Sequence, residues 1–292
     1  MRKFAVTLAR LTPPLRVLLF LAGLALLWLP LALPLYALAA TGALDLGGAI
    51  ATGLLYVGFL LVWPTWARQV HQLQKPWQTL GLIWQPGIVV DWLVGLSLGL
   101  GGIAALIGVE LALGWAVLLP PTAQLARFFL EGALVGLAVG LAEEILFRGW
   151  LLFELEQGGS RQQALVGTAL VFAIAHFIKP LPDILATLPQ FFGLFLLALT
   201  LGWARRTPSH VRPGHISALG YPVGLHGGLV WGYYLVNVGQ ITQITEVVPD
   251  WVTGIQGNPL AGLLGLGLLA GLAGLFYRSA HHQGEYSDSH RN

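Results

Sequence analysis

Apolar residues run along this chain in long stretches that short polar segments separate. Eight of these stretches approach the roughly 20 residues that an α-helix needs to cross the core of a bilayer. In chain order they are Val17–Ala40, Leu46–Trp63, Ile88–Leu111, Phe128–Phe153, Gln163–Ile178, Ala186–Ala204, His215–Asn237 and Leu260–Tyr277. The pattern predicts an all-α, multi-pass membrane bundle of about eight transmembrane helices.

The composition agrees with a membrane location. Charged residues make up 10% of the 292 residues and hydrophobic residues 56%, whereas soluble domains carry about 25% charged residues. The chain has no Cys, which excludes disulfides, thiol nucleophiles and thiolate zinc sites. Its basic residues are scattered rather than clustered, so we expect no nucleic-acid partner.

The basic residues also predict which way the helices run. With the N-terminus in the cytoplasm, only Arg127 and Lys179 fall on the opposite side, and Arg148 lies inside a stretch. The cytoplasmic segments then hold Arg2, Lys3, Arg10, Arg16, Arg68, Lys75, Arg161, Arg205, Arg206, Arg212, Arg278 and Arg291. This asymmetry follows the positive-inside rule, so both termini are expected in the cytoplasm, with the first stretch as an uncleaved signal-anchor.

Ionisable residues at membrane depth are costly and are therefore candidates for function. The inner half of the fourth stretch holds Glu143, Glu144 and Arg148. Glu144 and Arg148 are four residues apart, so they share a helix face and can form an ion pair. Glu143 is rotated by about 100° from Glu144 and points elsewhere. An unpaired carboxylate beside a paired one suits a general base; the alternative is a structural Glu–Arg lock with a spare Glu.

Two histidines stand at a depth similar to that of Glu143. At 1.5 Å per helical residue, Glu143, His176 and His226 lie about 17, 22 and 21 Å from the cytoplasmic end of their stretches. The three side chains can therefore meet near the midplane, and Gly227 and Gly228 would leave room there for a substrate or water. A carboxylate with imidazoles can activate water, either directly or through a metal.

Three other acidic residues are weaker candidates. Asp91, Glu110 and Glu131 lie near the ends of their stretches, where a side chain can reach a membrane interface. Glycines such as Gly95 and Gly99 are expected to allow close contact between helices.

The motif Glu143-Glu144-x-x-x-Arg148, followed by Phe172-x-x-x-His176 and by His226, resembles the pattern of the CPBP intramembrane proteases. That family includes the type II CAAX prenyl endoproteases and the bacterial Abi proteins, some of which are linked to bacteriocin processing or immunity. The resemblance covers residues 128–237. It implies an intramembrane endopeptidase that acts on a prenylated or otherwise membrane-bound peptide, in a bacterial-type cytoplasmic or thylakoid-like membrane.

The resemblance also implies roles for the polar residues. Glu143 would activate water with help from His176, Glu144 and Arg148 would form a supporting ion pair, and His226 would stabilise the oxyanion. The family is described as metal-dependent, yet some members resemble glutamate-type proteases without a metal. A zinc ion on Glu143, His176 and His226 and a metal-free mechanism therefore both stay open, as does the oligomeric state.

The chain departs from the family at Val230, where members commonly have Asn or Asp four residues after the histidine. The oxyanion site therefore loses a donor, unless Trp231 or a backbone group freed by Pro222 replaces it. This departure keeps a second hypothesis open, a non-catalytic immunity or scaffold protein. A proton-coupled transporter is a third, against which the lack of detectable inverted repeats counts.

The stretches and the resemblance together predict four regions. We expect N-terminal transmembrane helices and loops over residues 1–127 and a catalytic helical core over 128–237. A last transmembrane helix is expected within 238–279, followed by a disordered polar tail over 280–292.

Overall fold

The computed structural model of the chain describes residues 7–211 and 218–288, of which 282–288 as backbone only. The predicted cytoplasmic residues Arg2, Lys3, Arg212 and Arg291, and His215 at the start of the seventh stretch, lie outside the described residues. The main helices are α2 (Pro13–Ala40), α3 (Gly47–Val70), α5 (Ile88–Ala112), α6 (Leu125–Glu144), α8 (Arg161–Ala175), α10 (Gln190–Arg206), α11 (Gly220–Asn237) and α13 (Leu263–Asp288). Shorter elements are α4 (Pro76–Thr79), η1 (Ile145–Leu151), α7 (Leu152–Glu156), α9 (Leu181–Thr187), α12 (Asp250–Thr253), η2 (Ile255–Gly257) and η3 (Pro259–Ala261).

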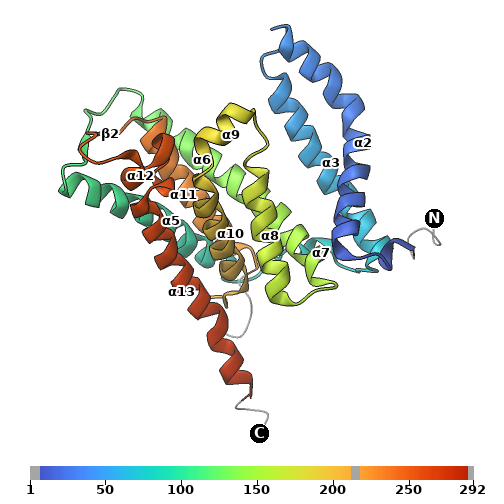
Figure 1. Cartoon of the computed structure of the whole chain (residues 1–292). Helices are drawn as coiled ribbons and strands as arrows, with labels where there is room; N and C mark the ends of the chain where they lie inside the picture. Colours follow the sequence, from blue (N-terminus) through green and yellow to red (C-terminus); the bar gives the residue numbers. More distant parts are fainter. Residues whose placement is uncertain (1–6, 212–217, 289–292) are drawn as a thin grey trace.

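The fold is helical apart from one short ribbon. Strands β1 (Ala116–Leu118) and β2 (Thr242–Ile244) pair antiparallel and join the segments that follow α5 and α11. Helix α13 continues to Asp288, into the segment for which a disordered tail is predicted, and residues 289–292 are outside the described part. Figure 1 shows the α2–α3 hairpin standing to one side of the remaining bundle, with the described ends of the chain at the same end of the molecule.

Fewer helices than the eight predicted are long and apolar enough to cross a membrane. Within the described residues, five helices are long and apolar enough, and the pair α9 and α10, bent by 75°, gives a possible sixth. Helix α8 has only 15 residues, about 22 Å at 1.5 Å per residue. Helix α11 is buried at every residue from Gly220 to Leu229. A span packed inside protein carries Gly, Tyr and His in place of Leu, which lowers its hydropathy.

Glycines bring α11 into close contact with α5 and α6. A Cβ added at Gly99 would lie 2.5 Å from the Leu225 carbonyl oxygen, and one at Gly136 would lie 2.5 Å from that of Gly227. A Cβ at Gly228 would meet the Leu96 carbonyl oxygen at 2.5 Å. The expected close helix contact is thus present at Gly99. The expectation that Gly227 and Gly228 leave room for a substrate is wrong, because neighbouring helices fill that space.

A pair of substitutions on α5 tests this packing. We expect Gly99→Ala to lower the free energy of unfolding by about 1–3 kcal/mol, because the added methyl group must push α11 away. Gly101→Ala is the matched control: nothing lies within 4 Å of its added Cβ, so we expect the better helix propensity of Ala to stabilise the protein by up to about 1 kcal/mol. Unfolding by SDS in a mild detergent would measure both, and equal effects would contradict the packing.

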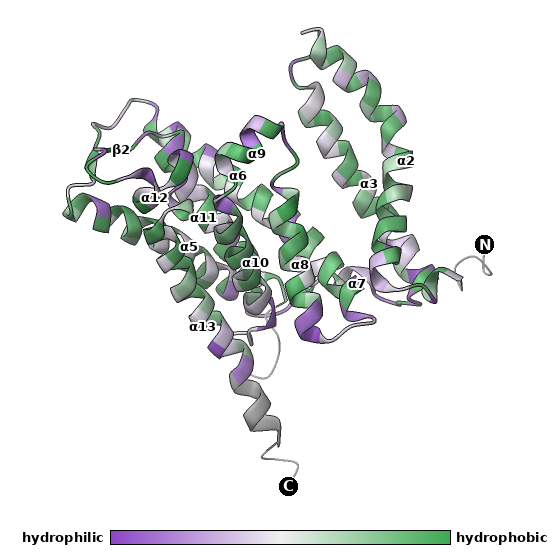
Figure 2. Cartoon of the chain, viewed as in Figure 1, coloured by the Kyte–Doolittle hydropathy of each residue, from purple (hydrophilic) through white to green (hydrophobic). Residues whose placement is uncertain are grey.

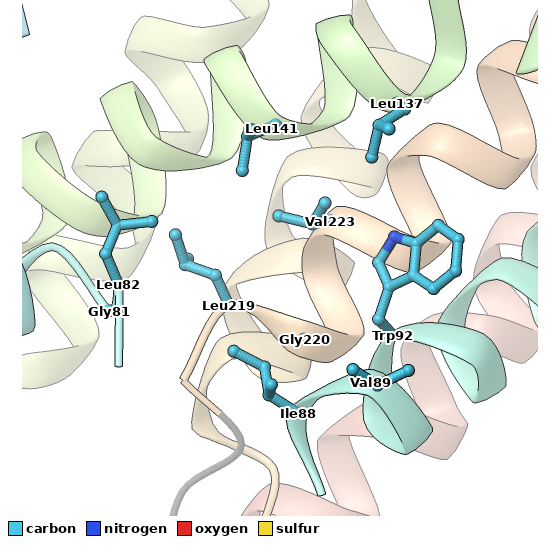
Figure 3. A pocket seen from close by; sticks show the side chains of 10 residues that line it. All are labelled: Gly81, Leu82, Ile88, Val89, Trp92, Leu137, Leu141, Leu219, Gly220 and Val223. Atoms are coloured by element: carbon cyan, nitrogen blue, oxygen red, sulfur yellow. The ribbon is translucent and has the colours of Figure 1, made fainter. Parts of the chain in front are cut away.

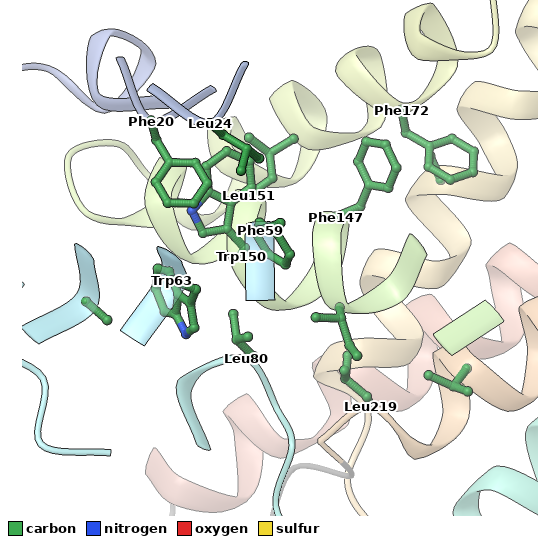
Figure 4. Packing of buried hydrophobic residues seen from close by; sticks show 14 of the residues in the cluster. Phe20, Leu24, Phe59, Trp63, Leu80, Phe147, Trp150, Leu151, Phe172 and Leu219 are labelled. Atoms are coloured by element: carbon green, nitrogen blue, oxygen red, sulfur yellow. The ribbon is translucent and has the colours of Figure 1, made fainter. Parts of the chain in front are cut away.

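An aromatic cluster joins the α2–α3 hairpin to the rest of the bundle. The Phe20 and Phe59 rings lie 4.8 and 5.8 Å from the Trp150 ring, and Trp63 is fully buried beside them. Figure 4 shows these side chains at one end of the cluster, with Phe147 and Phe172 at the other. The cluster therefore connects the N-terminal hairpin to the segment that follows Glu144.

A buried carboxylate adds a polar link at the same place. Glu154 is fully buried, and its oxygens accept hydrogen bonds from Arg16 Nε at 3.2 Å and Trp66 Nε1 at 2.7 Å, with His71 Nε2 at 2.8 Å. Figure 2 shows green, hydrophobic helix bodies, with purple residues collected at the beginning of α8 and in the connections between helices. The hydrogen bonds to Glu154 fix the hairpin at a polar end of the bundle.

Candidate active site

A π-helix follows directly after the two adjacent carboxylates. Helix α6 ends at Glu144, and η1 continues from Ile145 to Leu151 with π-type hydrogen bonding before α7 begins. The three segments form one continuous span over Leu125–Glu156. π-Bulges inside helices frequently occur at functional sites, and this one contains Arg148.

Glu144 is the centre of a buried polar network. Its side chain is fully buried, and Oε1 accepts hydrogen bonds from Arg148 Nη1 at 2.9 Å and from His226 Nδ1 at 2.8 Å. The predicted Glu144–Arg148 ion pair is therefore present, and the bond to His226 is an addition that the sequence did not indicate. Arg148 also donates to the Ala198 carbonyl at 3.0 Å. The network ties together η1, α10 and α11.

The network determines which nitrogen of His226 carries a proton. A carboxylate that is paired with Arg148 is ionised and can only accept hydrogen bonds. His226 must therefore donate from Nδ1, which leaves Nε2 free to face another group. The His226 side chain is 5% exposed, so this orientation is held away from bulk solvent.

Glu143 faces the free nitrogen of His226. Its Oε2 lies 4.0 Å from His226 Nε2, and this oxygen is buried without a hydrogen-bond partner. The Glu143 side chain is nevertheless 31% exposed. A gap of this length between two polar atoms suits a bridging water. Glu143 and His226 can thus hold one water molecule between them, with the carboxylate reachable from outside.

His176 approaches this group through an aromatic ring. It is the residue after the end of α8, and its Nδ1 donates to the Phe172 carbonyl at 2.8 Å. The fully buried Phe172 ring lies 4.5 Å from the His176 ring and 6.1 Å from that of His226, and Arg148 Cζ sits 4.6 Å from its centre. Within the described residues, no hydrogen bond or ion pair joins His176 to Glu143 or His226.

The structure therefore brings Glu143, Glu144, Arg148 and His226 into one group, with His176 next to it. Phe172 contacts three of these side chains, a role that sequence reasoning did not assign to it. The sequence could have indicated this role, because Phe172 stands four residues before His176 and such residues share a helix face.

A zinc ion on Glu143, His176 and His226 stays a prediction. Among the described residues, no group of three His, Cys, Asp or Glu side chains is arranged to hold a metal ion. Nδ1 of His176 donates to a backbone carbonyl and Nδ1 of His226 to Glu144. These bonds leave Nε2 of both rings available, which is also the arrangement of histidines that bind a metal.

The structure also bears on the expected oxyanion donors. Val230 lies one turn after His226 on α11, where it offers no hydrogen-bond donor from its side chain. The Trp231 ring packs 4.7 Å from the Phe129 ring, and its Nε1 is buried without a partner. Phe129 is fourteen residues before Glu143, about 21 Å along the helix axis. Trp231 is thus too far away to replace the missing donor.

An apolar groove opens close to the polar group. It has a volume of about 240 Å³ and is formed by the starts of α5 and α11, by α6 and by the loop after α4. Figure 3 shows Leu141 and Val223 in its wall. Val223 lies about one turn before His226 on α11, whereas Leu141 and Glu143 are two residues apart and point to opposite sides of α6. Trp92 closes another side. A hydrocarbon chain could therefore lie beside the catalytic candidates.

Comparison with known proteins gives one match. Residues 125–232 fit the family model described as type II CAAX prenyl endopeptidase Rce1-like. The matched segment begins at the start of α6 and ends within α11, so it includes Glu143, His176 and His226. No curated protein and no solved structure matches the chain.

Proposed function

We propose that this chain, whose residues 125–232 form an Rce1-like type II CAAX prenyl endopeptidase domain, is an intramembrane endopeptidase that hydrolyses a peptide bond with a water activated by Glu143. One observation carries the proposal. The buried Oε2 of Glu143 has no partner and faces His226 Nε2 at 4.0 Å, while Glu144 holds the opposite nitrogen of that ring.

Glu143 is the general base in this proposal. It takes a proton from the water between Glu143 and His226, and the resulting hydroxide attacks the carbonyl carbon of the scissile bond. The proton on Glu143 then passes to the nitrogen of the leaving amine as the C–N bond breaks. The products are one carboxylate and one amine, and no redox step or cofactor is required.

His226, together with Glu144 and Arg148, stabilises the negative charge that develops on the carbonyl oxygen of the scissile bond. With protons on both nitrogens, His226 donates from Nε2 to the oxyanion and from Nδ1 to Glu144. Glu143 then holds the proton from water, and two negative groups, the oxyanion and Glu144, face two cations, Arg148 and His226, so the group is electrically balanced in a site where unbalanced charge is expensive. Such prearranged donors stabilise a transition state more strongly in a dry site than in water.

The apolar groove suggests the substrate class. A peptide that carries a lipid chain, such as a prenyl group, could place that chain against Trp92 and Leu141. Its peptide portion would then extend past Val223, which lies one turn before His226 on α11. This arrangement supports a prenylated or otherwise membrane-anchored peptide as substrate.

We also propose that both termini face the cytoplasm. Arg161, Arg205 and Arg206 line one polar pocket, and Arg206 donates to the Arg161 carbonyl at the beginning of α8. Termini on one side require an even number of crossings. Eight crossings are reached if the short α8 and the buried α11 also pass through the bilayer with the six candidate spans.

Cleavage by the purified protein in liposomes tests the function. Peptides of one sequence, with and without a farnesyl group, would be supplied and the released fragments identified by mass spectrometry. We expect cleavage of the farnesylated peptide by the wild type and none by Glu143→Ala, which controls for contaminating proteases. A folded wild type that releases no product from either peptide would contradict the proposal and favour the non-catalytic alternative, which Val230 already supports.

Val230 offers a gain-of-function test. Val230→Asn would place an amide donor one turn from His226, and loss of a single oxyanion donor typically costs 100- to 1000-fold in kcat. We expect kcat to rise by about 10- to 100-fold, because an added donor is less well aligned than an evolved one. Val230→Leu fills the same space without a donor and should leave kcat unchanged. Equal rates for both variants would show that position 230 does not contact the oxyanion.

A further inference from the structure

Another buried acid, far from the active site, has no hydrogen-bond partner among the described residues. Glu110, near the end of α5, is 1% exposed, and neither of its carboxylate oxygens has a hydrogen-bond partner. The sequence predicted that it would reach an interface, and that expectation is wrong because the segments after α11 cover it. Burying a carboxylate without hydrogen-bond partners costs free energy. A bound group that pairs with Glu110 would offset this cost.

Glu110 borders a cavity of about 230 Å³. The cavity lies between the ends of α5 and α11, β2 and the loop around η2, at the upper left of Figure 1. Its polar lining includes Asn237, Gln240, Thr242 and Thr253. No Lys, Arg or His is among the described residues that line it, so Glu110 is the sole ionisable side chain among them.

The walls are built from unusual backbone conformations. Gln240 lines the cavity with φ 47°, and Gly257 with φ 72°. A non-glycine residue in this left-handed region is strained, and such strain concentrates at ligand sites. The strained loops hold the polar side chains around Glu110.

We propose that this cavity binds a small organic cation with N–H donors, of which a primary ammonium is the simplest. Both Glu110 oxygens and the side-chain oxygens of Asn237, Thr242 and Thr253 can accept hydrogen bonds from such a group. The apolar wall, Ile107 and Val236 among others, suits a short aliphatic chain.

Other cations fit this cavity less well. A divalent metal ion prefers several carboxylate ligands, and Glu110 is the only acid in the lining. A quaternary ammonium is usually recognised by an aromatic cage, and no aromatic side chain is among the described lining residues. A primary ammonium could come from a soluble amine or from the headgroup of phosphatidylethanolamine.

Thermal unfolding of the purified full chain tests the site. The protein in nanodiscs of phosphatidylcholine would be titrated with n-propylammonium chloride, with tetramethylammonium chloride at equal ionic strength as the comparison. A cation that binds only the folded state raises the Tm with its concentration. We expect n-propylammonium to do so with a Kd on the order of 1 mM, and tetramethylammonium to have no comparable effect.

Three variants locate the response. Glu110→Gln should weaken binding at least tenfold, whereas Glu246→Gln, the same change at an exposed residue after β2, should leave it unchanged. Asn237→Asp adds a second carboxylate to the cavity and should tighten binding several-fold, a gain that a folding defect does not imitate. The proposal is overturned if tetramethylammonium acts as strongly, or if Glu110→Gln responds like the wild type.

Nanodiscs that contain phosphatidylethanolamine separate the two sources of the amine. If the headgroup already occupies the cavity, the response of the wild type to n-propylammonium should shrink in them. An unchanged response assigns the site to a soluble amine. These measurements follow binding and not proteolysis, so their failure would leave the proposed endopeptidase activity unaffected.

Discussion

Replacing Glu143 by Gln is expected to lower kcat for peptide cleavage by about 100- to 10,000-fold, the usual contribution of a general base. The amide has nearly the same shape, but it cannot take a proton from the water beside His226. Glu143 makes no hydrogen bond in the described structure and is partly exposed, so we expect folding and KM to change little. Cleavage kinetics in liposomes and an unfolding curve would separate these quantities.

The same substitution elsewhere on α6 is the control. Glu131 accepts hydrogen bonds from Arg127 Nε at 2.6 Å and from the Tyr234 hydroxyl at 3.0 Å, three helical turns away from Glu143. Glu131→Gln should leave kcat unchanged. If Glu143→Gln kept full activity while Glu144→Gln abolished it, the base would be the other carboxylate and the proposed mechanism would be wrong.

Some of this site could be predicted from the sequence because it depends on helix geometry alone. Residues four apart on a helix share a face, so the Glu144–Arg148 pair follows from spacing and persists although η1 is a π-helix. Depth arithmetic also placed Glu143 and His226 at one level, since both are counted from the same side. These inferences need no knowledge of how the helices pack.

The remainder depends on packing between helices that are distant in sequence. The bond from His226 to Glu144 requires the exact rotation of α11 against α6, which contacts at Gly136 and Gly227 determine. The same contacts reversed the role expected of Gly227. The same arithmetic predicted His176 at that level, but α8 ends at Ala175 and the His176 ring lies against Phe172. Glu110 was misjudged because distant segments, β2 and η2 among them, cover the end of α5.

Replacing Arg148 by Met is expected to lower the free energy of unfolding by about 3–5 kcal/mol, because it removes one of the two cations of the buried group and leaves an excess negative charge there. The change also removes the hydrogen bond to the Ala198 carbonyl and the contact with the Phe172 ring. Cleavage should fall as well, since the carboxylate that orients His226 would lose its own hydrogen-bond donor, Arg148. SDS-induced unfolding in detergent and the liposome assay would measure the two effects.

Arg127→Met provides a matched comparison. Arg127 and Glu131 form an Arg–Glu pair with the same spacing on the same helix, but their side chains are 68% and 34% exposed. Exposed pairs contribute little to stability, so this change should shift the unfolding curve only slightly. A large shift for Arg127→Met would mean that burial is not what makes the Arg148 pair important.

A double variant separates the structural role of the pair from its catalytic role. Glu144→Gln combined with Arg148→Met removes both buried charges, and replacing a complete buried ion pair is often nearly neutral for stability. We therefore expect the double variant to recover most of the stability lost in Arg148→Met, with a coupling energy of about 1–3 kcal/mol. Cleavage should stay at least tenfold below the wild type, because His226 no longer has an anionic partner on Nδ1. Recovery of both stability and cleavage would instead reduce Glu144 and Arg148 to a structural lock, with Glu143 and His226 sufficient for the chemistry.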